Sequence, residues 1–192
     1  LGRHEDFTVI KVGETISCKE VYSERFNRAD WDFIKERVRS VCQKYNRATI
    51  MLDSTGYGDP IFEDLSKEGL PINGININVK TKPEMIENLQ LMIENQQIQL
   101  LDDKETVVEF GAFTYDLLPS GHVRYNAPKG FHDDCVIATA LMAYGMSTGA
   151  CNAIGVVDED EIQPEYNYDD IEDVISWDEE DIEEPLIYLS TN

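Results

Sequence analysis

The feature of this sequence that most constrains its fold is the short apolar segment at residues 48–52, which stops at Asp53. An apolar run of this length, followed by the turn-rich residues 54–60, is typical of a strand buried on both faces. A strand of that kind needs packing layers on both sides of its sheet. A carboxylate next to a buried strand is costly to bury unless the carboxylate is paired or binds a metal, so Asp53 is a candidate metal ligand. The alternative is that Asp53 is a simple turn residue at the end of the strand.

Strand-like and helix-like segments alternate through the first hundred residues, which predicts an α/β protein with a mixed sheet. Residues 7–12 alternate as a strand does, and Gly13-Glu14 predicts a tight turn into a second strand at 15–22. Apolar residues at three- and four-residue spacing predict amphipathic helices at 30–46 and behind Pro83. The other elements expected are helices at 61–68, 104–110 and 132–144, strands at 72–79 and 98–101, and a hairpin of 113–117 with 122–125.

The charge of the chain is concentrated near its carboxyl end. The formal net charge is −22, and residues 158–184 hold fifteen acids, while no Lys or Arg follows Lys129. Residues 1–157 therefore carry 23 acids and 16 bases, a net charge of −7. Beyond Gly149 the apolar residues are dispersed among acids, so we expect one folded domain at 1–149 and a disordered acidic tail at 150–192.

Several classes of protein are disfavoured by what the sequence lacks. No apolar run reaches the roughly 20 residues that span a bilayer, and charges near the start disfavour a secretory signal. The four cysteines form no CxxC pair, which favours a reduced, cytosolic protein. No GxxxxGK[ST] motif occurs, so we expect no ATP hydrolysis by this chain.

A second group of carboxylates opens the last predicted helix at His132-Asp133-Asp134. Acids in a first turn complement the helix dipole, but Asp134 is in register with the apolar positions of that helix and should be buried. Asp6 lies just ahead of the first strand, where a simple loop acid is the alternative. Carboxylates without a thiol or histidine cluster favour Mg²⁺ or Mn²⁺, and two such ions hydrolyse phosphodiesters.

Four motifs in this order resemble the large terminases of tailed bacteriophages. They are the opening LGRxxDxTV, the strand end DSTGxGDP, the segment KPEMIENL and the helix start HDDCVIATAL, and together they cover residues 1–148. The combination is fairly specific, whereas each motif alone is weak. In that family an ATPase motor precedes a carboxyl-terminal nuclease.

The resemblance implies a ribonuclease-H-like nuclease domain that cuts concatemeric double-stranded DNA during viral genome packaging, with two Mg²⁺ or Mn²⁺ ions. By matching position, Asp53 is the central-strand carboxylate, Asp133 and Asp134 are the last-helix carboxylates, and Asp6 is an accessory acid. The family pattern places a further catalytic aspartate directly before the Leu-Gly with which this chain opens. The implied partners are DNA, the upstream ATPase domain, the portal and the small terminase subunit, in the host cytoplasm and without a membrane.

An acidic surface disfavours nucleic acid, so DNA binding has to depend on a few local cations. The candidates are Lys129, Arg124, Lys80 and Lys82, although solvated surface charge is the simpler interpretation of each. A nuclease that acts on DNA held by a motor needs little affinity of its own. The alternatives are another ribonuclease-H-like nuclease, such as a resolvase or integrase, and a non-catalytic acidic module that binds a metal or a basic partner.

Overall fold

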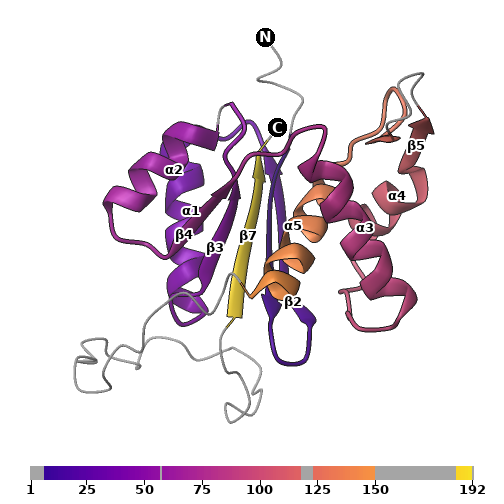
Figure 1. Cartoon of the computed structure of the whole chain (residues 1–192). Coiled ribbons are helices and arrows are strands. Elements are labelled where there is room, and N and C mark those ends of the chain that lie inside the picture. The colour runs from indigo at the N-terminus through magenta and orange to yellow at the C-terminus, as the bar shows by residue number, and fades with distance from the viewer. Residues whose placement is uncertain (1–6, 57, 118–122, 150–184, 192) are drawn as a thin grey trace.

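The computed structural model describes residues 7–56, 58–117, 123–149 and 185–191, with the backbone alone for 58, 59 and 185–191. Its centre is a five-stranded sheet in the order β2-β1-β7-β3-β4 (Figure 1). Strands β1 (Phe7–Glu14) and β2 (Lys19–Asn27) form an antiparallel hairpin. Strand β7 (Pro185–Thr191) pairs antiparallel with β1 and parallel with β3 (Thr49–Asp53), and β4 (Ile72–Ile75) continues parallel to β3. The prediction of a mixed sheet is confirmed.

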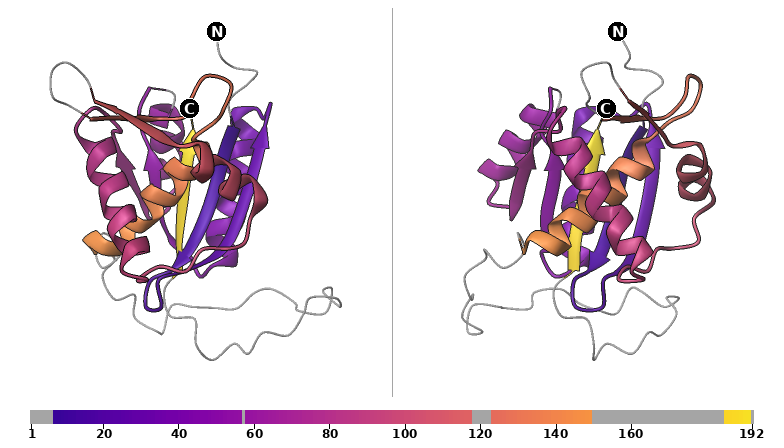
Figure 2. Two further views of the ribbon diagram at one scale, coloured as in Figure 1. Left: turned by 90° about the vertical axis from the view of Figure 1, so that its right-hand side faces the viewer. Right: turned by 45° about the vertical axis from the view of Figure 1, so that its right-hand side comes forward.

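Helices cover both faces of this sheet (Figure 2). Helices α1 (Trp31–Lys44) and α2 (Gly58–Lys67) lie on one face. On the other face α5 (Asp134–Thr148) packs directly against the strands, and α3 (Thr81–Glu94) and α4 (Lys104–Ala112) pack against α5. None of the described helices is long and apolar enough to cross a bilayer.

Strand β3 shows how the two faces are divided. All five of its residues are buried, as the apolar segment predicted. Ile50 and Leu52 belong to the apolar cluster under α1 and α2, whereas Met51 belongs to the cluster formed with α3 and α5. Successive side chains of a strand point to opposite faces, so Asp53 is on the face of Met51. The central-strand carboxylate therefore faces α5.

Helix α5 approaches β1 closely at Gly13. A Cβ atom at this position would lie 2.0 Å from Cε of Met146 and 2.9 Å from Sδ of Met142. Real Cβ contacts are not that short, so a side chain here would displace the flexible ends of these two methionine side chains. Gly13 thus leaves room for the methionines of α5 against β1.

The turn expected at Gly13-Glu14 occurs slightly later in the chain. Strand β1 continues to Glu14, whose carboxylate accepts hydrogen bonds from the amides of Ile16 and Ser17, both at 2.7 Å. This side chain organises the turn, and Cys18 completes it with a φ of 51°. The second strand consequently starts at Lys19 instead of residue 15.

The remaining predicted elements are mostly confirmed, with two differences. Strand β4 ends at Ile75, because Thr55 binds the backbone of Ile77 through its side chain and takes that residue out of the ladder. Residues 98–101 form only an isolated bridge between Gln99 and Lys19. The predicted hairpin is present as β5 (Thr114–Leu117) and β6 (Val123–Asn126).

The expectation of one acidic tail at 150–192 is wrong for its last residues, since 185–191 form the middle strand of the sheet. The composition changes at this point: the last acid is Glu184, and the strand reads PLIYLST. β-Branched, aromatic and aliphatic residues suit a strand, and β1 and β3 offer hydrogen-bonding partners on both sides. The prediction for 150–184 lies outside the described residues.

Candidate metal-binding and catalytic site

The carboxyl ends of the three parallel strands β3, β4 and β7 meet at one edge of the sheet. Helices α3 and α5 begin at the same edge, which is uppermost in Figure 1. Ligands of open α/β sheets bind outside the carboxyl ends of strands, because loops and helix amino termini converge there. The predicted site residues Asp53, Asp133 and Asp134 all belong to this edge.

Asp53 ends β3 and is only 3% exposed. Its Oδ1 accepts a hydrogen bond of 2.9 Å from the amide of Thr55. Burial raises the pKa of the Asp53 carboxyl above its ordinary value, and hydrogen bonds with Thr55 and the charge of Lys82 oppose that rise only in part. A cation beside this carboxylate would relieve the cost of its burial.

Asp134 opens α5 and is 2% exposed, which confirms the prediction that it lies on the buried side of the helix. Its Oδ2 lies 3.5 Å from Nδ1 of His132. The neighbouring Asp133 is partly exposed, and its Oδ2 lies 2.9 Å from Nζ of Lys82. The two adjacent acids thus have different surroundings.

Lys82 connects these carboxylates from the first turn of α3. It forms the ion pair with Asp133, and its charge also acts on Asp53. Lys82 and Asp133 are 51 residues apart in the sequence, so no local pattern indicated this pair. Pro83 predicted that a helix starts beside Lys82, but not that this helix start lies next to α5. The contact of Lys82 with DNA stays a prediction.

The donor set suits a hard divalent cation. Asp53, Asp133 and Asp134 supply only carboxylate oxygens, the ligands that Mg²⁺ and Mn²⁺ prefer. Within the described ranges, no three His, Cys, Asp or Glu side chains gather closely enough to hold an ion by themselves. Asp6, the fourth predicted ligand, lies outside the described residues.

A buried acid that the sequence analysis did not single out lies behind this site. Glu109 of α4 is 4% exposed, and its Oε2 accepts a 2.7 Å hydrogen bond from the amide of Cys135. Its Oε1 accepts a 2.9 Å hydrogen bond from Nη2 of Arg25. The helical pattern of residues 104–110 gave no sign of this contact, although an acid on a buried helix face is itself unusual.

Cys135 cannot serve as a nucleophile in this position. Burial raises the pKa of its thiol to about 12, and the nearby charge of Glu109 acts in the same direction. The thiolate is the reactive form, so the side chain is inert at neutral pH.

The other candidate DNA contacts lie on the loops and the hairpin that precede α3 and α5. Lys80 immediately precedes α3 and is exposed, and Lys129 is exposed in the loop between β6 and α5. Arg124 of β6 is paired with Asp116 of β5 at 3.0 Å, with both side chains more than half exposed. Tyr125 on this hairpin lies near Tyr115, with ring centroids 6.2 Å apart. Tyr115 is exposed, whereas Tyr125 is half-buried against the core. An exposed aromatic ring beside cations is a surface on which nucleic acid can stack, and these contacts remain predictions.

Two relatives with curated descriptions share most of this chain. No protein-family model matches it. The chain is 30% identical over 149 residues to the large terminase subunits of Thermus virus P23-45 and Thermus phage G20c. Each alignment covers 77% of this chain and 30% of the relative, so the chain spans under a third of the length of these proteins.

Solved structures resemble the fold over a similar range. The large terminase nuclease of thermophilic phage G20c with bound magnesium has a TM-score of 0.69 and 28% identity, over 75% of this chain and 77% of that chain. The same nuclease with bound zinc has a TM-score of 0.61 and 26% identity, over 73% and 75%. The large terminase nuclease domain of Thermus phage P74-26 has a TM-score of 0.67 and 26% identity, over 76% and 75%.

Proposed function

We propose that this chain, a homologue of the nuclease domains of phage large terminases that shares their ribonuclease-H-like fold, is a metal-dependent DNA endonuclease. The observation that carries the proposal is the presence of two buried carboxylates at the carboxyl edge of the sheet. Asp53 and Asp134 are each at most 3% exposed. Buried acids lower stability unless something compensates their charge, so their presence at one edge favours a function in cation binding.

The residues of this edge would hold the metal as oxygen ligands. When bound, two divalent ions about 4 Å apart supply an activated water and stabilise the leaving oxygen of a phosphodiester. Asp53 and Asp134 provide carboxylates from two different elements, and Asp133 and Asp6 complete the proposed ligand set. Lys82, which pairs with Asp133, offsets part of their negative charge.

We place the activity in viral genome packaging, with concatemeric double-stranded DNA as the substrate. An ATPase domain of the same protein, the portal and the small terminase subunit are the partners proposed, in the cytoplasm of the host. The net charge of −7 in residues 1–157 opposes tight DNA binding. Lys129, Arg124 and Lys80 are the cations proposed to contact the DNA, which the motor holds in place.

Nicking of supercoiled plasmid in Mn²⁺ or Mg²⁺ tests the proposal. The wild-type chain should nick the plasmid, and EDTA should abolish the reaction. Asp53→Asn and Asp134→Asn should each lower the rate by roughly 100-fold or more, the scale seen when a group that stabilises the reacting centre is lost. Asp64→Asn, on the opposite face, is the matched control and should stay within about twofold of wild type. Nicking that persists in EDTA, or in both site variants, contradicts the proposal.

A further inference from the structure

The amino terminus of α5 is held by a residue from another helix. An N-cap side chain ordinarily accepts a hydrogen bond from the second or third amide of its helix. Asp133 is the N-cap of α5, yet its side chain makes no capping hydrogen bond. Cys135 carries the second amide, and that amide donates to Glu109 of α4 at 2.7 Å. Glu109 thus caps α5 in place of Asp133.

The capping of α5 by Glu109 has a consequence for Asp133. Aspartate is among the best capping residues, but Asp133 has φ −127° and ψ 14°, outside the extended geometry usual for a capping side chain. Glu109 occupies the amide of Cys135, and the carboxylate of Asp133 pairs with Lys82 at 2.9 Å. The negative charge of Glu109 also complements the positive end of the α5 dipole. The carboxylate of Asp133 is therefore not used to cap α5.

Glu109 is itself fixed by Arg25 of β2. Nη2 of Arg25 donates to Oε1 of Glu109 at 2.9 Å, with side chains 21% and 6% exposed. The guanidinium lies 3.6 Å from the centre of the Phe7 ring, and Phe7 meets the ring of His132 edge-on at 5.0 Å. His132 in turn lies 3.5 Å from Asp134. A continuous line of contacts therefore runs from the acid that caps α5 to the carboxylate at its first position.

We propose that Glu109, fixed by Arg25, is a positioning residue that keeps Asp133 and Asp134 turned toward the metal site by capping α5 from outside. The inference rests on the proposed function, since it assigns Glu109 to the same site. Glu109 does not bind the metal; it sets the orientation of residues that do. Groups that orient metal ligands typically contribute 10- to 100-fold to metal affinity.

Two variants at this position separate capping from charge. Glu109→Leu has a similar size and removes the acceptor for the amide of Cys135. Glu109→Gln keeps a carbonyl oxygen that can accept this hydrogen bond but removes the charge next to Arg25. Glu20→Gln is the matched control, because Glu20 is also a 4% exposed acid bound to a cation, Lys11, while its second oxygen accepts from the amide of Leu101 rather than from α5.

The main measurement is the rise in melting temperature of the full chain as Mn²⁺ is added, which requires no turnover. Glu109→Leu should raise the Mn²⁺ concentration for half the full effect by about 10-fold or more, as for loss of other ligand-orienting groups. Glu109→Gln should recover most of that affinity, and Glu20→Gln should leave it unchanged even where it lowers the melting temperature. In nuclear magnetic resonance spectra, the amide proton of Cys135 should move upfield in Glu109→Leu, because its hydrogen bond to a carboxylate is lost.

The outcomes separate the two proposals. If wild type shows a Mn²⁺-dependent shift and Glu109→Leu shows the same half-effect concentration, the positioning role is wrong while the metal site stands. If Glu20→Gln weakens Mn²⁺ as much as Glu109→Leu does, the effect is general destabilisation and the positioning role is again wrong. If wild type shows neither the shift nor plasmid nicking, the proposed function fails. The Cys135 amide then still reports whether Glu109 caps α5.

Discussion

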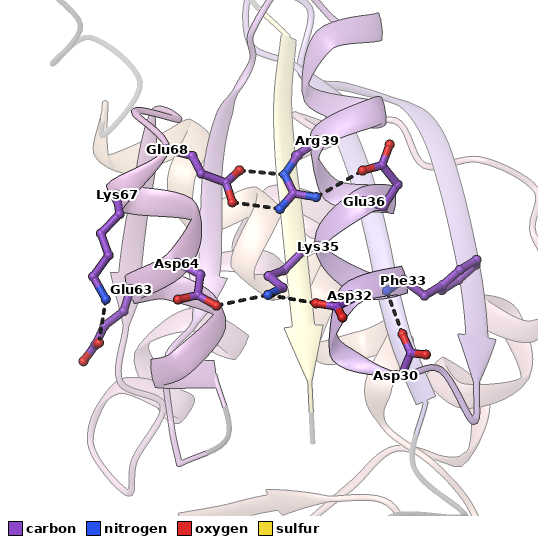
Figure 3. Close-up of polar contacts among 10 residues, drawn as sticks. All are labelled: Asp30, Asp32, Phe33, Lys35, Glu36, Arg39, Glu63, Asp64, Lys67 and Glu68. Atoms are coloured by element: carbon purple, nitrogen blue, oxygen red, sulfur yellow. Dashed lines mark hydrogen bonds and ion pairs between the residues drawn. The ribbon is translucent and has the colours of Figure 1, made fainter.

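The two faces of the central sheet use their acids in opposite ways. On the face of α1 and α2, acids lie on the surface, and those drawn in Figure 3 pair with bases, except for Asp30, which accepts from the amide of Phe33. Glu68 binds Arg39 through two hydrogen bonds of 2.6 and 2.7 Å, and Asp64 binds Lys35 at 3.0 Å. On the face of α5, Asp53 and Asp134 are buried at the sheet edge.

The difference teaches which charges support the fold and which lower its stability. Exposed ion pairs contribute about 0–1 kcal/mol each, since water and salt screen them. Hydrogen bonds to Lys35 and Arg39 lower the pKa values of Asp64 and Glu68, whereas burial raises that of Asp53. Folding therefore favours the charged form of Asp64 and Glu68 and disfavours the charged form of Asp53. A buried carboxylate such as Asp53 lowers stability by itself, so what it binds has to explain its presence.

The largest effect is expected where both faces depend on one element, strand β7. Deleting residues 185–192 removes the strand between β1 and β3, leaving two unpaired strand edges and taking away sheet surface that both α1 and α5 contact. We expect cooperative unfolding to be lost, as measured by circular dichroism during heating. Shortening the segment 158–184 while keeping β7 is the control and should preserve the transition. A shortened chain without 185–192 that melts like wild type would place β7 outside the folded core.

A smaller effect, with a sign set by pH, is expected for Asp53→Asn in EDTA. Because the pKa of Asp53 is raised in the folded state, its stabilisation is present below its unfolded pKa and is lost as pH rises through the folded value. At pH 7 the neutral amide should therefore raise the melting temperature by about 2 °C or more, which corresponds to roughly 1 kcal/mol in a domain of this size.

The gain in Asp53→Asn should vanish when the pH falls to about 3.5, where the carboxyl is protonated in both states. Saturating Mn²⁺ should reverse the order of the two melting temperatures, because only wild type then has its full set of ligands. Equal melting temperatures at pH 7 in EDTA would mean that the burial of Asp53 has no cost.

The smallest effect is expected for Glu68→Gln on the opposite face. The lowered pKa of Glu68 means that its stabilisation is present above the unfolded pKa and is lost as pH falls through the folded value. The pair with Arg39 is partly exposed, so the loss at pH 7 should stay below about 1 kcal/mol. Repeating the melts in 1 M salt should remove most of the difference. A salt-independent loss would indicate that this pair is not screened as a surface pair should be.

Much of the secondary structure and the burial of Asp53 and Asp134 could be predicted from local patterns, whereas the burial of Glu109 could not. Asp134 shares a helix face with Ile137 and Leu141, and this spacing alone placed it on the buried side, as the structure confirms. The start of β2 was predicted too early, because the turn before it depends on the side chain of Glu14 rather than on Gly13. Boundaries of this kind are set by individual hydrogen bonds, which periodicity does not report.

By itself, the sequence determined the alternation of strands and helices and the two carboxylates that interrupt apolar elements, since periods of two and about 3.6 residues record which side of an element is buried. Only the tertiary structure decided what each buried side meets. It placed residues 185–191 between β1 and β3, brought Lys82 to Asp133 across 51 residues, and brought Arg25 to Glu109 across 84. A local pattern states that a group needs a partner, whereas the partner depends on how distant elements pack.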